Sequence, residues 1–168
     1  MDLGALLLEL YGRIPPLAKD AVDGVSTPRL TERPGPGANT IAWLIWHLTR
    51  IQDDHVCEVA HREQEWTAGG WADRFGLPFE REAHGYGHDS GEVAAVQADA
   101  EMLTGYHDAV YEQTIRYVGT LTDADLPRVV DESWDPPVTL GVRLVSVISD
   151  DLQHVGQAAF IRGFLLRQ

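Results

Sequence analysis

The chain has 168 residues, of which 44% are hydrophobic, and its 26 acidic and 13 basic residues give a formal net charge of -13. Nucleic acids and anionic membrane surfaces attract clustered Lys and Arg, so this charge argues against both as partners. The N-terminal sequence lacks the basic flank and cleavage site of a signal peptide, and apolar runs fall short of the ~20 residues that span a bilayer. The single cysteine, Cys57, excludes an internal disulfide, and we expect a cytoplasmic protein.

The length predicts one domain over residues 1–168 with a substantial core. Its first element is a helical segment over residues 3–23, where leucine and other apolar residues recur at helical spacing. Pro15 and Pro16 lie in the middle of this segment, so we expect a kink or two short pieces. Residues 24–38 are rich in Pro and Gly and are predicted to form a loop.

A second helix is expected over about residues 40–63, with Asn39 or Thr40 as its N-cap. His47 lies in the middle of the apolar face of this helix, among aliphatic residues spaced three and four apart. The pattern therefore places an imidazole at a position that faces the core.

Residues 64–90 are the least regular stretch and are rich in aromatic residues and Gly. Connections in compact domains are typically about 4–6 residues long, and a tight turn between antiparallel helices would not need so much chain. A crossover between two parallel helices would need it. We expect this crossover to pack against the helices, with Trp66, Trp71 and Phe75 forming either a lid or a dimer face.

A third helix is expected to begin at a capping box formed by Asp89 and Glu92 and to end near residue 120. A connecting segment follows, in which RVVDESW is the one short candidate for a strand. Thr139 is then expected to cap a fourth helix that ends near residue 166. Four helices with a long second connection predict an all-α fold, an up-down-down-up four-helix bundle.

The fourth helix carries an acid and a histidine, Asp150 and His154, four residues apart. Helical spacing stacks these side chains on one face, about 6 Å apart along the axis, on nearly the same bearing as the apolar Val147 and Ala158. Burying both groups without partners would cost several kcal/mol. In the predicted bundle His47 lies at the same depth, so the three side chains are expected to converge.

Two imidazoles and a carboxylate with an open position suit Zn²⁺ or Ni²⁺, and also Fe²⁺ or Mn²⁺. The alternative is that both histidines are core residues, hydrogen-bonded to Asp150 or to the backbone. Asp151 is turned about 100° away from Asp150 and would replace it only if the helix were rotated. Cys57 has no basic neighbour at helical spacing apart from His61, so we expect a buried small residue rather than a nucleophile.

Three further polar residues are near these positions in the predicted arrangement. Arg143 lies on the same helix face as His154, three turns earlier, and could receive a substrate carboxylate or extend to solvent at the helix start. His84 and His88 lie in the crossover. They could approach the mouth of the site, but cap or surface positions are the simpler expectation.

With these residues the chain resembles the DinB/YfiT-like superfamily of metalloenzymes, which includes mycothiol-dependent maleylpyruvate isomerases and bacillithiol- and mycothiol-dependent S-transferases. The resemblance covers the whole chain and rests on WLIWHLTRIQDDH in the second helix, DDLQHVGQAAFIRG in the fourth, the long crossover and the four-helix layout. Many members carry HxxxHxGQ in the fourth helix, and in isomerase-like members the first histidine is Glu. Here the pattern is Asp150-x-x-x-His154-x-Gly156-Gln157. The resemblance implies metal ligands at His47, Asp150 and His154.

The resemblance also implies an activity. In characterised relatives the metal binds the thiol of a small cofactor such as mycothiol and favours the thiolate, which attacks a small electrophile. We therefore expect a metal-dependent thiol S-transferase with a small-molecule substrate; a homodimer is compatible with it, since four-helix bundles often pair. Two alternatives stay open. One is a hydrolase or isomerase that uses metal-bound water, and the other is a non-catalytic bundle that binds a small molecule or a partner.

Overall fold

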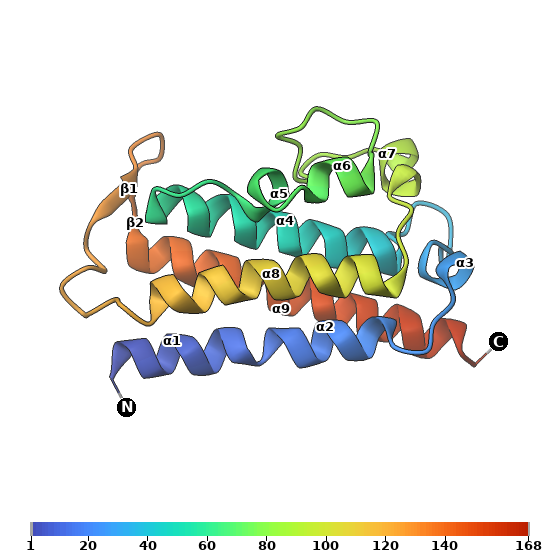
Figure 1. Cartoon of the computed structure of the whole chain (residues 1–168), viewed down its shortest axis with the longest axis horizontal. Coiled ribbons are helices and arrows are strands. Elements are labelled where there is room, and N and C mark those ends of the chain that lie inside the picture. The colour runs from blue at the N-terminus through green and yellow to red at the C-terminus, as the bar shows by residue number, and fades with distance from the viewer. Residues whose placement is uncertain (1, 168) are drawn as a thin grey trace.

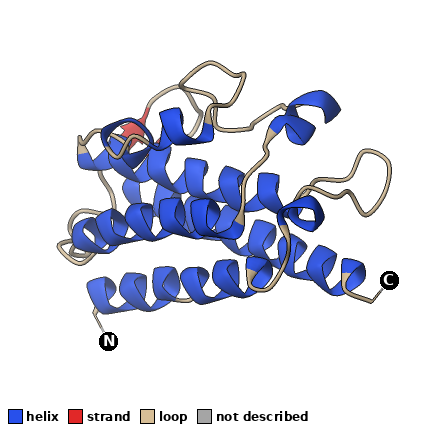
Figure 2. Cartoon of the chain, turned by 45° about the vertical axis from the view of Figure 1, so that its right-hand side comes forward, coloured by secondary structure: helices blue, strands red, loops and turns tan. Residues whose placement is uncertain are grey.

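Four long helical rods lie side by side in a computed structural model that describes residues 2–167 (Figure 1). The expected all-α class is confirmed, because the sheet is a single short hairpin (Figure 2). The long helices are α1 (Leu3–Gly12) with α2 (Ile14–Val22), α4 (Ile41–Ala60), α8 (Ala100–Val118) and α9 (Leu140–Leu165). The shorter elements are α3 (Thr27–Leu30), α5 (Glu65–Ala68), α6 (Trp71–Phe75), α7 (Ser90–Ala95), β1 (Val129–Asp131) and β2 (Val138–Thr139).

The direction of the chain can be followed by colour in Figure 1. α1, α2 and α9 run from left to right, whereas α4 and α8 run from right to left. The segment between α4 and α8 returns along the outside of the rods through α5, α6 and α7. α4 and α9 are therefore antiparallel, and they pack against each other along their lengths.

The break between α1 and α2 occurs where the two prolines predict it. Arg13 separates the helices, and Pro15 and Pro16 fall in the first turn of α2. Backbone amides in the first turn have no partner within the helix, so proline is tolerated there. The two helices continue as one rod along the bundle (Figure 1).

α4 is the central helix of the bundle. It begins at Thr40, whose hydroxyl accepts a hydrogen bond from the backbone N–H of Trp43 at 3.1 Å, as a capping residue does. Every residue from Ile41 to Asp53 is buried, because α8, α9 and the crossover surround the helix. Polar side chains in this stretch need partners inside the protein.

The third helix differs from its expected form. The capping box at Asp89 and Glu92 is confirmed, but the helix it starts ends at Ala95, and α8 begins only at Ala100. Asp99 caps α8 by accepting a hydrogen bond from the N–H of Met102 at 2.8 Å. A second N-cap in the sequence thus divides the segment, and the expectation of one helix from 89 to 120 was wrong.

The connection before α9 contains a small antiparallel hairpin of β1 and β2. β1 lies within RVVDESW, the candidate strand. Thr139 caps α9 as expected, with its hydroxyl accepting from the N–H of Val142 at 3.4 Å. Arg143 forms an ion pair with Asp131 of the hairpin at 2.9 Å. Within residues 2–167, the helices are all too short or too polar to cross a membrane.

Candidate metal centre

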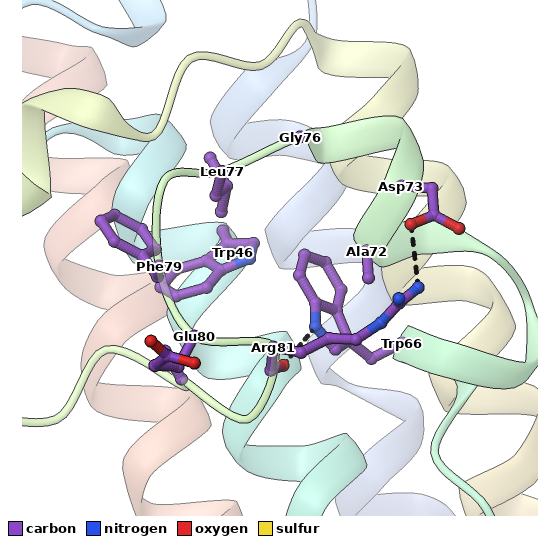
Figure 3. Close-up of a pocket in the computed structure, with 10 residues that line it drawn as sticks. Trp46, Trp66, Ala72, Asp73, Gly76, Leu77, Phe79, Glu80 and Arg81 are labelled. Carbon is purple, nitrogen blue, oxygen red and sulfur yellow. Dashed lines mark hydrogen bonds and ion pairs between the residues drawn. The ribbon is translucent and has the colours of Figure 1, made fainter.

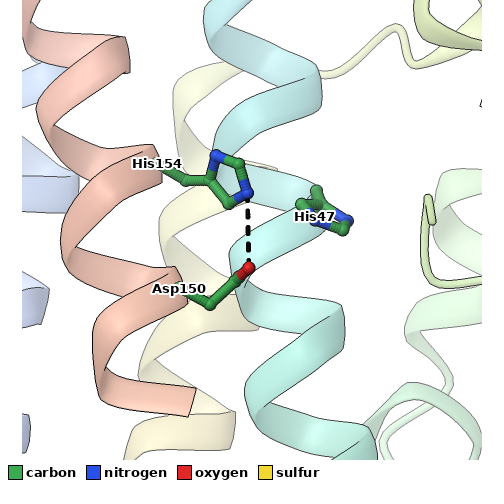
Figure 4. A group of neighbouring side chains, drawn as sticks. All are labelled: His47, Asp150 and His154. Carbon is green, nitrogen blue, oxygen red and sulfur yellow. Dashed lines mark ion pairs between the residues drawn. The ribbon is translucent and has the colours of Figure 1, made fainter. Parts of the chain in front are cut away.

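His47 is the contribution of α4 to the site. Its side chain is 5% exposed and lies where α4 faces α9 on one side and the crossover on the other (Figure 4). The indole of Trp43, one turn earlier, stacks on the imidazole with ring centroids 4.6 Å apart. The ring is therefore buried and stacked on an aromatic side chain.

Asp150 and His154 come from α9, one turn apart, and both point toward His47 (Figure 4). One ligand atom from each of the three side chains lies within 4.8 Å of the other two. His154 Nε2 is 3.4 Å from Asp150 Oδ1, and the two imidazole centroids are 4.9 Å apart. The structure thus brings together the three residues that the sequence singled out.

In both histidines the ring nitrogen Nδ1 has a hydrogen-bond partner outside the group of three side chains. His47 Nδ1 lies 2.5 Å from the backbone carbonyl oxygen of His84, and His154 Nδ1 lies 3.3 Å from the amide oxygen of Gln157. Both partners are oxygens that only accept, so both Nδ1 atoms carry the proton. The neutral ring of His47 is left with a free Nε2 lone pair, the arrangement found in histidines that bind metals, whereas Nε2 of His154 lies 3.4 Å from the Asp150 carboxylate.

The three side chains fit a small divalent ion. Tetrahedral ligands with bonds of about 2.0–2.2 Å lie roughly 3.4 Å apart, and the His154–Asp150 separation of 3.4 Å matches this spacing. The three ligand atoms are at most 4.8 Å apart. Side-chain movements of roughly 1 Å would bring all three to the tetrahedral spacing. Oδ2 of Asp150 is buried and has no hydrogen-bond partner among residues 2–167, so this oxygen is available as a ligand.

Burial and charge act differently on the two histidines. Burial lowers the pKa of His47 from 6.5 to about 4, so the ring is neutral at pH 7. The hydrogen bond to Asp150 raises the pKa of His154, because the carboxylate stabilises the imidazolium. Metal binding therefore competes with protonation more strongly at His154 than at His47.

Residues 13–158 match the sequence family described as the DinB superfamily. The chain belongs to the DinB superfamily. Its fold is also similar to a crystal structure described as that of the conserved protein of locus from Enterococcus faecalis, with a TM-score of 0.92 and 28% sequence identity. That similarity covers 100% of this chain and 99% of the other. A search of curated proteins found no match.

In this DinB chain the site is open on the α9 side. The side chains of His154 and Asp150 are 19% and 31% exposed. A groove of about 640 Å³ lies along α9, and Gln157, the hydrogen-bond partner of His154, forms part of its wall. The lining residues are uncharged: Pro34, Ala38, Asn39, Leu152, Gln153, Gly156, Gln157, Phe160 and Ile161.

The position of α9 corrects one detail of the sequence analysis. The core stripe of the helix contains Asp151, which is fully buried, whereas Asp150 lies at its edge. Asp151 is within about 40° of Val147 and about 20° of Ala158 around the helix, closer than Asp150 is. Burial raises the pKa of Asp151 well above its usual value, with the charge of Asp150 adding to the shift. Asp151 is thus a core carboxyl that lies outside the candidate metal site.

The other residues that the sequence analysis considered lie outside the group of three side chains. Cys57 is buried as expected, and burial raises the pKa of its thiol to about 12, which excludes a thiolate at neutral pH. Arg143 is engaged by Asp131. His88 is half-buried: its ring stacks on Trp46, and its Nδ1 accepts a hydrogen bond from Trp43 at 3.2 Å. The imidazole of His84 lies outside the site, but its backbone carbonyl holds His47.

A buried polar network next to the site was missed in the sequence. Arg50 and Asp53 are 0% and 1% exposed and lie one turn and two turns after His47 on α4. Asp53 accepts hydrogen bonds from the backbone of Glu65 and Trp66 and from the hydroxyl of Tyr106. The available signal was the occurrence of two charged residues inside the most apolar stretch of the helix.

Proposed function

We propose that this protein is a divalent-metal-dependent enzyme that transfers a small thiol of the mycothiol type to a small electrophile. The observation that carries the proposal is the convergence of His47, Asp150 and His154, which each offer one ligand atom within 4.8 Å of the other two. Membership of the DinB superfamily supports a metal at this position.

The residues of the chain have distinct parts in this proposal. His47, Asp150 and His154 hold the ion, with Zn²⁺ or Ni²⁺ as the first candidates and Fe²⁺ or Mn²⁺ as the next, since imidazole and carboxylate ligands serve all four. A bound divalent ion would favour the thiolate of a coordinating thiol at neutral pH. The protein then needs no nucleophile of its own, in agreement with the buried, protonated state of Cys57, its one cysteine.

The exposed side of α9 gives the substrate its approach. Asp150 and His154 are partly exposed there, and Gln157, the hydrogen-bond partner of His154, lines a groove of about 640 Å³. Its uncharged lining favours a neutral portion of a thiol or electrophile, with amide groups of Gln153 and Gln157 available for hydrogen bonds. On the opposite side the crossover covers His47 and limits access. A purely structural histidine–aspartate pair would not require an opening on the ligand side.

Metal binding and thiol dependence test the proposal separately. We expect purified protein to bind Zn²⁺ or Ni²⁺ with a stoichiometry of one ion per chain, and added ion at 100 times its Kd to stabilise the fold by about 2.7 kcal/mol. Turnover of a small electrophile should require both the ion and an added low-molecular-weight thiol. Turnover with the ion but without thiol would instead indicate hydrolysis or isomerisation. Failure to bind any of the four ions would leave a non-catalytic bundle.

A further inference from the structure

The crossover lies against α4 through a row of backbone carbonyls. We call the segment Arg81–Gly85 the strap. Its first four carbonyl oxygens, at consecutive residues, each accept a hydrogen bond from a side chain of α4 or α5; Figure 3 shows the first of these, from the Trp66 indole. The four bonds are Trp66 Nε1 to Arg81 at 2.8 Å, Arg50 Nη2 to Glu82 at 3.4 Å, Arg50 Nε to Ala83 at 3.1 Å, and His47 Nδ1 to His84 at 2.5 Å.

Arg50 supplies two of these four bonds, and its own position is fixed. The side chain is fully buried, and its Nη1 donates to the amide oxygen of Gln64 at 2.7 Å. The guanidinium lies 4.8 Å over the ring of Trp66 and 3.8 Å from the carboxylate of Asp53. A buried guanidinium with this many partners has little freedom. Arg50 therefore holds the backbone of the strap in a fixed position against α4.

Gly85 allows the strap to pass close to the imidazole. Its φ is +100°, in the region that favours glycine. A Cβ at this position would lie 2.6 Å from His47 Nδ1 and 3.1 Å from ring atoms of Trp43 and Trp46. Any larger residue would push the strap away from α4 at the point where the His84 carbonyl meets His47.

We propose that the strap positions the metal ligand His47, with Arg50 and Gly85 as the residues that hold it in place. The carbonyl of His84 fixes the proton on Nδ1 and the plane of the ring, so that Nε2 faces Asp150 and His154. Arg50 acts one turn further along α4, on the two carbonyls that precede His84. The role in metal binding depends on the proposed function, whereas the tautomer of His47 does not.

Substitution of Gly85 tests the inference, and the same loop offers a matched control. Gly87 also has a left-handed φ, +77°, but a Cβ there meets nothing within 4 Å among the described residues. Gly85→Ala and Gly87→Ala therefore share the backbone strain, and only the first displaces the strap. Long-range ¹H–¹⁵N NMR of metal-free protein reads the tautomer of His47, and competition with a chromogenic chelator gives the Zn²⁺ affinity.

We expect wild-type His47 to show Nδ1–H in the metal-free protein. Gly85→Ala should lose this signature and bind Zn²⁺ about 10–100-fold more weakly, the usual cost of removing a group that orients a metal ligand. Gly87→Ala should change neither. Arg50→Lys, which keeps the charge but cannot reach two carbonyls with a planar fork, should lose part of the signature; it provides the test if Gly85→Ala does not fold.

The outcomes separate the inference from the proposed function. Wild-type His47 protonated on Nε2, or Gly85→Ala with an unchanged tautomer and Zn²⁺ affinity, would overturn the role of the strap even if the protein binds Zn²⁺. Wild-type protein with Nδ1–H on His47 but without Zn²⁺ binding would support the strap as the element that fixes the tautomer and overturn the metal-dependent function.

Discussion

The two sides of the candidate site hold their ligands in different ways. On α4, His47 is buried and is fixed by a backbone carbonyl of the crossover. On α9, Asp150 and His154 are partly exposed, and the partner of His154 is a side chain of the same helix, Gln157. A backbone carbonyl in a strap held by four bonds moves less than a glutamine on a helix surface. The difference suggests a rigid α4 side that sets the position of the ion and an adaptable α9 side that admits substrate.

Removing a ligand from either side should give the largest effect on metal binding, with unequal consequences for the stability of the fold. We expect His47→Ala and His154→Ala each to weaken Zn²⁺ binding more than the ~100-fold upper cost of losing an orienting group. His47→Ala should also lower the free energy of unfolding of metal-free protein by about 1–3 kcal/mol, since it truncates a buried side chain, whereas His154→Ala should change it by less than about 0.5 kcal/mol.

Chelator competition and urea titration of the two variants measure these effects. A His154→Ala protein that keeps wild-type Zn²⁺ affinity would show that α9 does not bind the ion. Equal losses of stability in the two variants would remove the distinction between a rigid and an adaptable side.

In metal-free protein, lowering the pH should change the contributions of the two histidines to the free energy of unfolding in opposite directions. The folded pKa of His47, about 4, lies below 6.5, so the unfolded state binds the proton first. Its contribution to stability is lost as pH falls from 6.5 toward 4, by up to about 3 kcal/mol. The pKa of His154 is raised, so its contribution is complete below pH 6.5 and is lost as pH rises through the folded pKa.

Urea titrations between pH 7 and about 4.5 test this pair of signs. His47→Asn should flatten the loss of stability in acid, and His154→Asn should steepen it. The same direction of change in both variants would contradict the environments described for the two rings.

The α9 side of the site can be tested at Gln157, the residue that orients His154. Gln157→Ala removes the acceptor at Nδ1 and should weaken Zn²⁺ binding about 10-fold, at the lower end of the cost of an orienting partner. Gln153→Ala is the matched control, because Gln153 lies in the same groove but donates to the backbone of Ser149. A weakening in Gln153→Ala as large as in Gln157→Ala, measured by chelator competition, would count against this role.

The smallest expected effect on metal binding is that of Asp151, the acid next to Asp150 on α9. Burial raises the pKa of Asp151, so ionisation opposes folding above the unfolded pKa near 3.8. Asp151→Asn should increase the free energy of unfolding at pH 7 by on the order of 1 kcal/mol without changing Zn²⁺ affinity, whereas Asp150→Asn should reduce that affinity strongly. Parallel melting curves and Zn²⁺ titrations check both. If Asp151→Asn lost Zn²⁺ binding and Asp150→Asn kept it, Asp151 and not Asp150 would be the metal ligand.

The sequence predicted the parts of the site that depend on regular spacing. His47 in the middle of an apolar face, and Asp150 and His154 one turn apart, follow from helical periodicity, and α4 and α9 position them as expected. Periodicity did not decide which of Asp150 and Asp151 faces the core. Adjacent residues differ by about 100°, and the rotation of α9 is set by its packing against α2 and α4.

The strap could not have been predicted from the sequence. Its contacts are made by backbone carbonyls, which every residue has, and the one residue-specific sign was a glycine among several in the same loop. The division of the third helix was detectable in principle, because Asp99 is an N-cap residue type, but the apolar spacing on either side of it stays in phase and masks the break.

Anomalous scattering from crystals soaked with Zn²⁺ or Ni²⁺ tests the central claim most directly. We expect one strong peak about 2.0–2.2 Å from Nε2 of His47, Nε2 of His154 and a carboxylate oxygen of Asp150, with the His84 carbonyl still bonded to Nδ1 of His47. A soaked crystal without a peak between α4 and α9, in which His154 stays directly bonded to Asp150, would contradict the metal centre.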